Sequence, residues 1–416
     1  MADWSKSMQQ TFEFYTVNPE SWRDVKKLTN VVRCNITWDS EQETLGSATF
    51  DVIDSIEEGY VRVYMITNQN GVKEKHPLGT FLVQTPSSSF DGKIKTVSAD
   101  AYTPLLELKE KSPPIGFYIQ EGADIMEEVY KLMNENMRGP VVEPVTPSTK
   151  LNDNFAADTN DTWLTFLTDL ISASTTVTHT KVELGEDGMY VKRPEEVTIP
   201  EGVTITQLLE KTKSNDIVYT YTHEGVTHYF TTTEGITRYR LALDKIGNVM
   251  FEPVLDIEQM VPVWTYNDDN SSILYPDISI DHDLYGIPNV VEVIYDDKEK
   301  YLISEKVNED PRSPVSTVSR GRRIMHRVMN PSLHGEITQD ALDKYAEELL
   351  KTLSSIECSV TYTHGYCPVR VGDCVRLNYT RAGLKDVKAK VISQSIDCST
   401  GCSVSEKAVF ISKLWG

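Results

Sequence analysis

The sequence predicts an α+β protein that is mostly β and consists of several domains. The chain has 416 residues, more than the roughly 100 to 200 residues of a single domain. Alternating or β-branched segments separated by turn residues occupy both ends of the chain. Apolar residues at helical spacing occur in the middle and once more near the end. We expect a β domain, a mixed helix and hairpin domain, a β-rich connecting domain, and a helix followed by a second β domain, at residues 1–112, 113–255, 256–335 and 336–416.

The first predicted domain is a set of β-hairpins. Strand patterns cover four segments, which are Gly46 to Asp54, Tyr60 to Ile66, Leu78 to Gln84 and Lys93 to Ala99. Asn70-Gly71 and Asp91-Gly92 supply residues that tolerate positive φ, as two-residue hairpin turns require. Pro113-Pro114 then marks the domain boundary.

The middle of the chain combines helices with short hairpins. Helical spacing between Gly122 and Met137 ends at Gly139-Pro140, and an irregular connection follows from Pro140 to Asn160. Asp161 or Thr162 can cap a second helix, whose apolar arc is wide enough to predict deep burial. Hairpin strands follow at Ile217 to Thr222 and Thr227 to Thr233 around Glu224-Gly225, and at Tyr239 to Leu243 and Val249 to Phe251 around Gly247-Asn248.

The last third returns to β character around one amphipathic helix. Val261 to Tyr266 and Val290 to Tyr295 read as strands, and Thr338 is the expected N-cap of a helix that reaches Leu353. Four strands are predicted after this helix, at Ser359 to Thr363, Val375 to Tyr379, Val387 to Ile396 and Val409 to Leu414.

The formal net charge of −21 makes attraction to nucleic-acid phosphates unfavourable. An acidic surface would instead let DNA pass without binding. The charge is uneven, because residues 252–310 carry 15 acidic and 3 basic residues whereas residues 358–416 carry 4 acidic and 8 basic ones. This asymmetry either steers one subunit against another or reflects two differently charged solvated surfaces.

No apolar run approaches the roughly 20 residues that a membrane helix needs. The N-terminus also lacks the basic and then apolar layout of a signal peptide. We therefore expect no membrane segment, and we expect synthesis and assembly in a cytoplasm.

Candidate chemical sites are few, and we expect no catalytic, cofactor-binding or metal-binding residues. His223 and His228 superficially resemble a zinc-protease motif, but three residues rather than two separate Glu224 from the second histidine, and a hairpin replaces the required helix. Cys367 near His364 is the best available nucleophile and base pair, yet a packed or surface role is favoured. No phosphate-binding glycine loop or Gly-x-Ser-x-Gly elbow is present, and no carboxylate pair stands out.

The cysteines and one basic segment need separate interpretation. Five of the six cysteines lie between Cys358 and Cys402 without a Cys-x-x-Cys pair, which favours buried reduced thiols in strands over a zinc site. Ser319 to Arg327 is a basic island in an acidic chain. Pairing with carboxylates of a neighbouring subunit is the preferred interpretation, with nucleic-acid phosphates and simple solvation as alternatives.

Several short motifs follow one another in a fixed order: Val17 to Trp22, Leu45 to Asp51, Leu78 to Pro86, Ile287 to Val291, Asn308 to Pro311, Arg322-Arg323 and Val371 to Asp373. In combination they resemble the central hub proteins of phage baseplates and of related contractile injection machines. The resemblance covers most of the chain and is weakest between residues 140 and 235.

This resemblance implies a multidomain hub with two tail-tube-like β domains and a mixed α/β middle. Three copies would form a ring with six-fold-like symmetry that initiates the tail tube, holds a spike or tip below, and leaves a channel for DNA. It implies a structural, non-enzymatic virion protein of the tail baseplate or tip. Tail-tube or tube-adaptor and spike or tip proteins would be its partners.

The strands Gly46 to Asp54, Tyr60 to Ile66, Val375 to Tyr379 and Val387 to Ile396 are the expected sites of contact between subunits. Because the chain ends at Leu414-Trp415-Gly416, directly after the last predicted strand, we expect no appended enzyme. The alternative function is a tail-tip protein that cleaves carbohydrate or binds glycans as an adhesin. An aromatic-lined cleft with paired carboxylates would favour that alternative.

Overall fold

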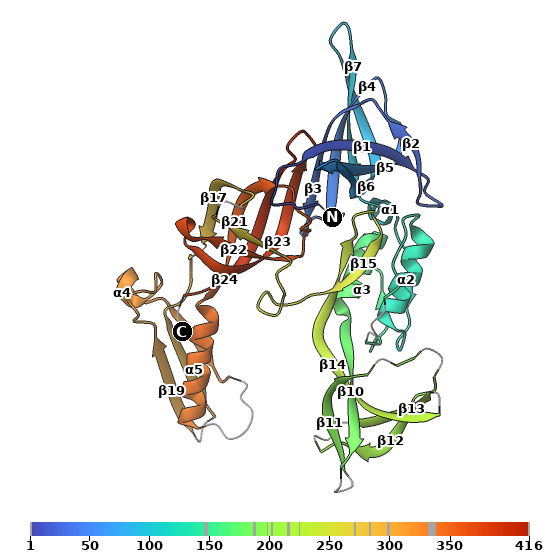
Figure 1. Ribbon diagram of the computed structural model, residues 1–416. Helices are drawn as coiled ribbons and strands as arrows, with labels where there is room; N and C mark the ends of the chain where they lie inside the picture. The colour runs from blue at the N-terminus through green and yellow to red at the C-terminus, as the bar shows by residue number, and fades with distance from the viewer. Residues whose placement is uncertain are drawn as a thin grey trace.

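The computed structural model of the protein describes residues 2–144, 149–185, 189–197, 199–200, 203–213, 217–223, 225–269, 272–282, 284–297, 300–331 and 338–414. Strands make up 51% and helices 13% of the structure, which confirms the predicted α+β class with mostly β content. Figure 1 shows two adjoining β bodies from which two arms extend, one with helix α5 and the other with helices α2 and α3.

The first β body contains seven strands: β1 (Gln9–Val17), β2 (Asp24–Leu28), β3 (Val31–Asp39), β4 (Gly46–Ile53), β5 (Gly59–Gln69), β6 (Val72–Phe90) and β7 (Lys95–Tyr102). Their order is β3-β4-β7-β6-β5-β1-β2. Asn70 and Gly71, at φ of 53° and 84°, form the predicted two-residue turn between β5 and β6. The turn at Asp91-Gly92 is longer than predicted, because the Asp91 carboxylate accepts hydrogen bonds from the amides of Lys93 and Ile94, both at 2.8 Å, and holds a four-residue loop.

Three helices and two short strands form the middle of the chain: α1 (Leu106–Lys109), α2 (Ile125–Asn136), α3 (Trp163–Ala173), β8 (Tyr118–Ile119) and β9 (Phe155–Ala156). Thr162, one of the two predicted caps, accepts the amide of Thr165 at 3.1 Å and begins α3. Phe166, Leu167 and Leu170 are buried in the core, as predicted from the wide apolar arc. None of the described helices is both long and apolar enough to cross a membrane.

A hairpin sheet extends from these helices through β10 (Thr175–Leu184), β11 (Tyr190–Glu196), β12 (Thr206–Lys211), β13 (Ile217–His223), β14 (Val226–Leu243) and β15 (Val249–Pro253). Glu224, expected in the β13–β14 turn, lies outside the described residues. Strand β14 is 18 residues long. Its first half pairs with β13 and β10 in the distal sheet, and its second half pairs with β15 beside the helices. One strand therefore belongs to both parts of this arm (Figure 1).

The second β body contains β16 (Trp264–Asn267), β17 (Leu274–His282), β21 (Ser355–Gly365), β22 (Cys374–Tyr379), β23 (Leu384–Asp397), β24 (Ser403–Lys413) and a short 3-10 helix (Thr380–Ala382). Strand β23 pairs with β3 of the first body from Ser393↔Asp39 to Asp397↔Asn35. This pairing joins the two bodies into one sheet of 13 strands.

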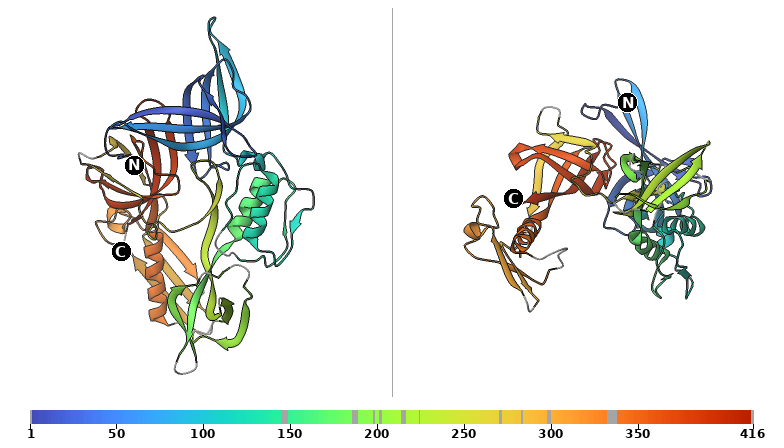
Figure 2. Two further views of the ribbon diagram at one scale, coloured as in Figure 1. Left: turned by 45° about the vertical axis from the view of Figure 1, so that its right-hand side comes forward. Right: turned by 90° about the horizontal axis from the view of Figure 1, so that it is seen from below.

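A small sheet forms the other arm, with β18 (Val290–Asp296), β19 (Tyr301–Val307), β20 (Met325–Met329), α4 (Thr317–Arg320) and α5 (Gln339–Leu353). The helix predicted up to Leu353 is confirmed, with Thr338 accepting the amide of Ala341 at 3.2 Å. Its Leu342, Ala346 and Leu350 pack against this sheet rather than against the strands that follow the helix. Residues 256–335 thus contribute to two sheets, and the view from below in Figure 2 shows α5 apart from α2 and α3.

Candidate assembly surfaces and the domain junction

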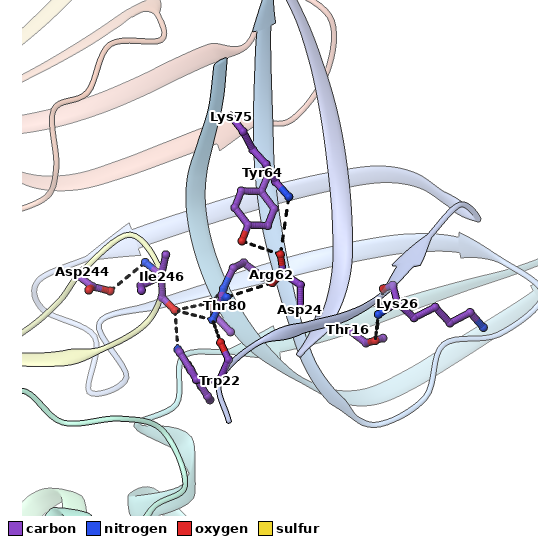
Figure 3. Close-up of polar contacts among 10 residues, drawn as sticks. All are labelled: Thr16, Trp22, Asp24, Lys26, Arg62, Tyr64, Lys75, Thr80, Asp244 and Ile246. Atoms are coloured by element: carbon purple, nitrogen blue, oxygen red, sulfur yellow. Dashed lines mark hydrogen bonds and ion pairs between the residues drawn. The ribbon is translucent and has the colours of Figure 1, made fainter. Parts of the chain in front are cut away.

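The turn between β14 and β15 docks on the first β body. The Ile246 carbonyl accepts hydrogen bonds from Trp22 Nε1 at 2.9 Å, Thr80 Oγ1 at 2.7 Å and Arg62 Nη2 at 3.3 Å (Figure 3). Gly247 follows at φ +85°, and a Cβ placed there would lie 2.9 Å from Thr80 Cβ. The turn therefore needs a glycine next to its contact point, both for its backbone conformation and for the close approach.

Arg62 is the buried cation at the centre of this contact, with 5% of its surface exposed. Its Nε donates to Thr80 Oγ1 at 2.8 Å, and its Nη1 pairs with Asp24 at 3.1 Å. Asp24 also accepts the Tyr64 hydroxyl at 2.9 Å. Because a buried charge is tolerated only when it is paired and hydrogen-bonded, these contacts hold the docking surface in one geometry.

Trp22 reaches the turn because the motif from Val17 to Trp22 forms a loop closed by Asn18. The Asn18 side-chain oxygen accepts the amides of Glu20 at 3.0 Å and Ser21 at 2.9 Å. The Asn18 carbonyl accepts the amide of Trp22, which adopts φ of 55°. Sequence reasoning singled out this motif but not its role. Nothing in the sequence pattern indicated Ile246 as its partner.

The second motif of the junction is the Val371 to Asp373 turn. Gly372 adopts φ +97°, and a Cβ there would lie 2.0 Å from Arg240 Nη2. Arg240 comes from β14 and pairs with Glu252 of β15 at 2.8 Å. Arg370 approaches the same Glu252 at 3.5 Å. This turn therefore brings the second β body against the middle of the chain.

A polar cluster lies buried in the core of the second β body. The Glu406 carboxylate is its centre and is 1% exposed. It lies 3.3 Å from His364 Nε2 and accepts hydrogen bonds from Tyr362 at 2.8 Å, Tyr266 at 3.1 Å and Gln394 at 2.7 Å. His364 Nδ1 lies 2.6 Å from the Gly365 carbonyl. Both ring nitrogens therefore face oxygen acceptors, as expected of a protonated imidazole.

Electrostatics keep this pair charged. Burial lowers the pKa of His364, but its contacts with Cys367 and Glu406 outweigh burial and raise that pKa to about 10. Burial raises the pKa of Glu406, but His364, Tyr362 and Gln394 together hold it below its usual value. Cys367 lies 3.9 Å from His364 Nδ1 and contacts Tyr266 at 3.2 Å. Cys367 and His364, for which the sequence favoured a packed or surface role over a nucleophile and base pair, are thus both buried and belong to this larger cluster.

The other candidate chemical residues lie in ordinary structural positions. His223 and His228 are on the paired strands β13 and β14, and the His228 ring stacks on Tyr221 at 4.9 Å. All six cysteines are free and buried, which confirms the interpretation as reduced thiols. Only Cys34, Cys358 and Cys374 lie in strands, so the placement in strands was wrong for the other three. No group of three or more His, Cys, Asp or Glu side chains is arranged to hold a metal ion in the described part of the chain.

No family model matches the chain, and no curated protein is similar to it at a significant level. Two solved structures are similar over almost their whole length. A tail protein from Neisseria meningitidis MC58 has 12% identity and a TM-score of 0.51, covering 96% of each chain. The 43 kDa tail protein of prophage MuSo2 from Shewanella oneidensis has 10% identity and a TM-score of 0.50, covering 96% of this chain and 98% of its own. The chain has the fold of a phage tail protein. This confirms, for the fold, the resemblance recognised in the sequence.

In this tail-protein fold, the strands expected to contact neighbouring subunits are internal. Strand β4 lies between β3 and β7, β5 between β1 and β6, and β22 between β16 and β23, while β23 pairs with β22, β24 and β3. Their hydrogen-bonding edges are therefore occupied within the chain, and a neighbouring copy could reach only their faces. Along its main path the large sheet ends instead at β2 and β17, and β16 is a further edge strand, since among the described residues it pairs with β22 alone.

The basic island of the tail-protein fold is largely satisfied within its own chain. Arg323 pairs with Glu305 at 2.6 Å, and Arg327 pairs with Glu292. Arg320 donates to the Ile287 carbonyl at 2.9 Å. Strands β18 and β19 bring carboxylates of the same chain within reach of Arg323 and Arg327, and Arg320 reaches a backbone carbonyl, so these three arginines have partners without a neighbouring subunit. The prediction remains for Arg322, which is exposed.

Asn289 and Asn308, which come from two of the sequence motifs, form hydrogen bonds that hold the loop carrying the basic island. Asn289 is fully buried and donates to the carbonyls of Val315 and Arg322, both at 3.0 Å. Its side-chain oxygen accepts the amide of Ile324 at 2.7 Å. Asn308 is also fully buried, and its backbone amide donates to the Asn289 carbonyl at 2.9 Å. Two of the motifs that suggested the tail-protein resemblance therefore form one hydrogen-bond network beside the small sheet.

Proposed function

We propose that this chain is a structural, non-enzymatic protein of the phage virion tail, a baseplate or tail-tip hub. In this role three copies form a ring that initiates the tail tube and connects it to a spike or tip. The observation that carries the proposal is the single 13-stranded sheet formed by two β bodies. The similarity of its fold to solved tail proteins supports it.

The two ends of this sheet differ in charge in a way that supports head-to-tail contact between copies. Edge strand β2 exposes Lys26 and Lys27, with Val25 67% exposed beside them. Edge strand β17 exposes Asp277 and Asp281. Figure 1 places β2 and β17 at opposite ends of the sheet. An open strand edge is a template for pairing, and a heterologous contact that closes after three copies gives a ring.

A ring of three copies would present six β bodies to a tail-tube or tube-adaptor protein above, with a spike or tip protein below. The formal charge of −21 supports a channel that DNA crosses without binding. Assembly in the host cytoplasm, before the protein becomes part of the tail baseplate, completes the proposal.

The test is the mass of the purified protein by light scattering, alone and with tail-tube and spike proteins encoded beside it. A trimer, alone or with a partner, is the expected result. The edge contact is tested by Lys26→Glu, which should prevent trimer formation, and by Lys26→Glu combined with Asp281→Lys, which should restore it. Lys93→Glu, a charge reversal on an exposed loop residue away from both edges, is the matched control.

A monomer that persists with both partners would contradict the hub proposal. Cell-wall cleavage and glycan binding would then be assayed, since they distinguish the carbohydrate-cleaving and adhesin alternatives. A trimer that Lys26→Glu leaves intact would refute the β2–β17 contact alone.

A further inference from the structure

A cavity of about 60 Å³ lies where the two β bodies and the middle of the chain meet. Trp38 and Leu78 line it from the first body, Arg240 and Lys245 from the middle, and Arg370 from the second body. A water molecule needs roughly 10 to 15 Å³ measured in this way, so the cavity holds about four oxygen-sized atoms. It is therefore large enough for a small polar ligand and too small for a macromolecule.

The two arginines of the cavity are only partly used by protein carboxylates. Arg240 contacts Glu252 through Nη2 at 2.8 Å, and its Nε is buried without a hydrogen-bond partner. Arg370 reaches both Glu252, at 3.5 Å, and Asp373, at 3.7 Å, through the same Nη2. Unsatisfied donors in a buried polar site usually have a bound partner, such as an ordered water or an ion.

Lys245 adds a third cation, and among the residues that the structure describes no carboxylate lies within ion-pair distance of its ammonium. Burial lowers the pKa of Lys245, and the charge of Arg370 lowers it further. Asp244 also lines the cavity, and its carboxylate accepts the amides of Ile246 at 2.9 Å and Asn248 at 2.8 Å. Three cations thus meet at the cavity beside the carboxylates of Glu252 and Asp373, and the buried Nε of Arg240 stays without a hydrogen-bond partner among them.

We propose that this cavity binds one small tetrahedral oxyanion of the phosphate or sulfate class, held by Arg240, Lys245 and Arg370. The free donors on two guanidinium groups and one ammonium suit the oxygens of such an ion. The four oxygens of such an ion match the volume of the cavity, which holds about four oxygen-sized atoms. Because each part of the chain contributes to the lining, the bound ion fastens the two β bodies to the middle of the chain. This inference does not depend on the proposed hub function.

The experiment measures binding of inorganic phosphate to the full chain by calorimetry and by the shift in melting temperature, with chloride at equal ionic strength as reference. We expect saturable binding of one phosphate per chain and a rise in melting temperature that chloride does not reproduce. Lys245→Met removes the charge but keeps the apolar stem. It should weaken phosphate binding at least about tenfold, the effect of losing one charge-assisted hydrogen bond. Lys93→Met, at an exposed residue remote from the cavity in sequence, should bind as the parent chain does.

Three results would overturn the inference. Absence of a phosphate-specific shift would mean that water alone fills the cavity. An undiminished shift in Lys245→Met would place the ion elsewhere. A shift with a short DNA duplex, but not with inorganic phosphate, would indicate a surface site for nucleic acid. If Lys245→Met does not fold, Arg370→Gln gives the same comparison from the second β body.

Discussion

Glu406→Gln tests whether the buried cluster of the second β body contains a true ion pair. Glutamine has almost the same shape, and the tyrosine hydroxyls can turn to accept from its amide, so the main change is the lost charge. The side chains of His364 and Glu406 are both 0% exposed. Without the Glu406 charge, His364 would therefore be a buried cation that has lost its counter-ion. Removing one partner of a buried pair costs about 3 to 5 kcal/mol. The variant should therefore lose a large part of the roughly 5 to 15 kcal/mol that stabilises a typical protein.

Hydrogen–deuterium exchange resolved on β21 and β24 is the suitable assay, since it reports the opening free energy of this body separately from the two arms. A double-mutant cycle with His364→Gln completes the test. The double variant removes both charges and should recover most of the lost stability. Glu347→Gln, which breaks an exposed pair with Lys351 on α5, is the control and should leave exchange in β21 and β24 unchanged. A loss below about 1 kcal/mol in Glu406→Gln, or strictly additive losses in the cycle, would refute the ion-pair argument.

Three further predictions follow from the same structure. Because folding raises the pKa of His364 from 6.5 to about 10, the stabilisation by its ion pair with Glu406 is complete below a pH of about 6.5 and is lost as the pH rises through about 10. The urea midpoint of the second β body should therefore fall over this pH range, whereas the midpoint of Glu406→Gln should stay constant. Gly372→Ala places a Cβ 2.0 Å from Arg240 Nη2 at a backbone φ of +97°, whereas Gly116→Ala has a φ of +80° and no neighbour within 4 Å. The melting temperature should therefore fall further in Gly372→Ala than in Gly116→Ala, and equal decreases would contradict the close contact. Thr162→Ala removes the N-cap of α3 and should cost about 1 kcal/mol in urea unfolding, whereas Thr162→Ser should be nearly neutral, and equal losses would mean that the cap does not act through its hydroxyl.

Local features of this fold could be predicted because their causes are local. Asn70-Gly71 forms its hairpin turn since both residues adopt positive φ. Thr162 and Thr338 begin helices because their hydroxyls accept amides of the first turn. The joining of β3 to β23 could not be predicted in this way. It pairs residues more than 350 positions apart, and no turn or periodicity specifies such a partner.

The functional surfaces were only partly accessible from sequence. The motifs near Trp22 and Gly372 were recognised, but their partners, Ile246 and Arg240, belong to none of the motifs that carried the resemblance. Glu406 was missed although one signal existed. Glu406 lies two residues from Val404 and two from Ala408, which are both buried. The strand pattern therefore places its carboxylate on the same inner face, where it requires partners.

Strand β14 also has a mechanical consequence. Its 18 residues span about 60 Å at the usual rise of a strand. One end lies in the distal hairpin sheet, and the other leads into the turn that presents Ile246 to Trp22, Thr80 and Arg62. Strand β14 thus connects the distal sheet directly to the turn that contacts the first β body. Displacement of the distal sheet would therefore act on the hydrogen bonds at the Ile246 carbonyl and on the contact of Arg240 and Glu252 with the Val371 to Asp373 turn.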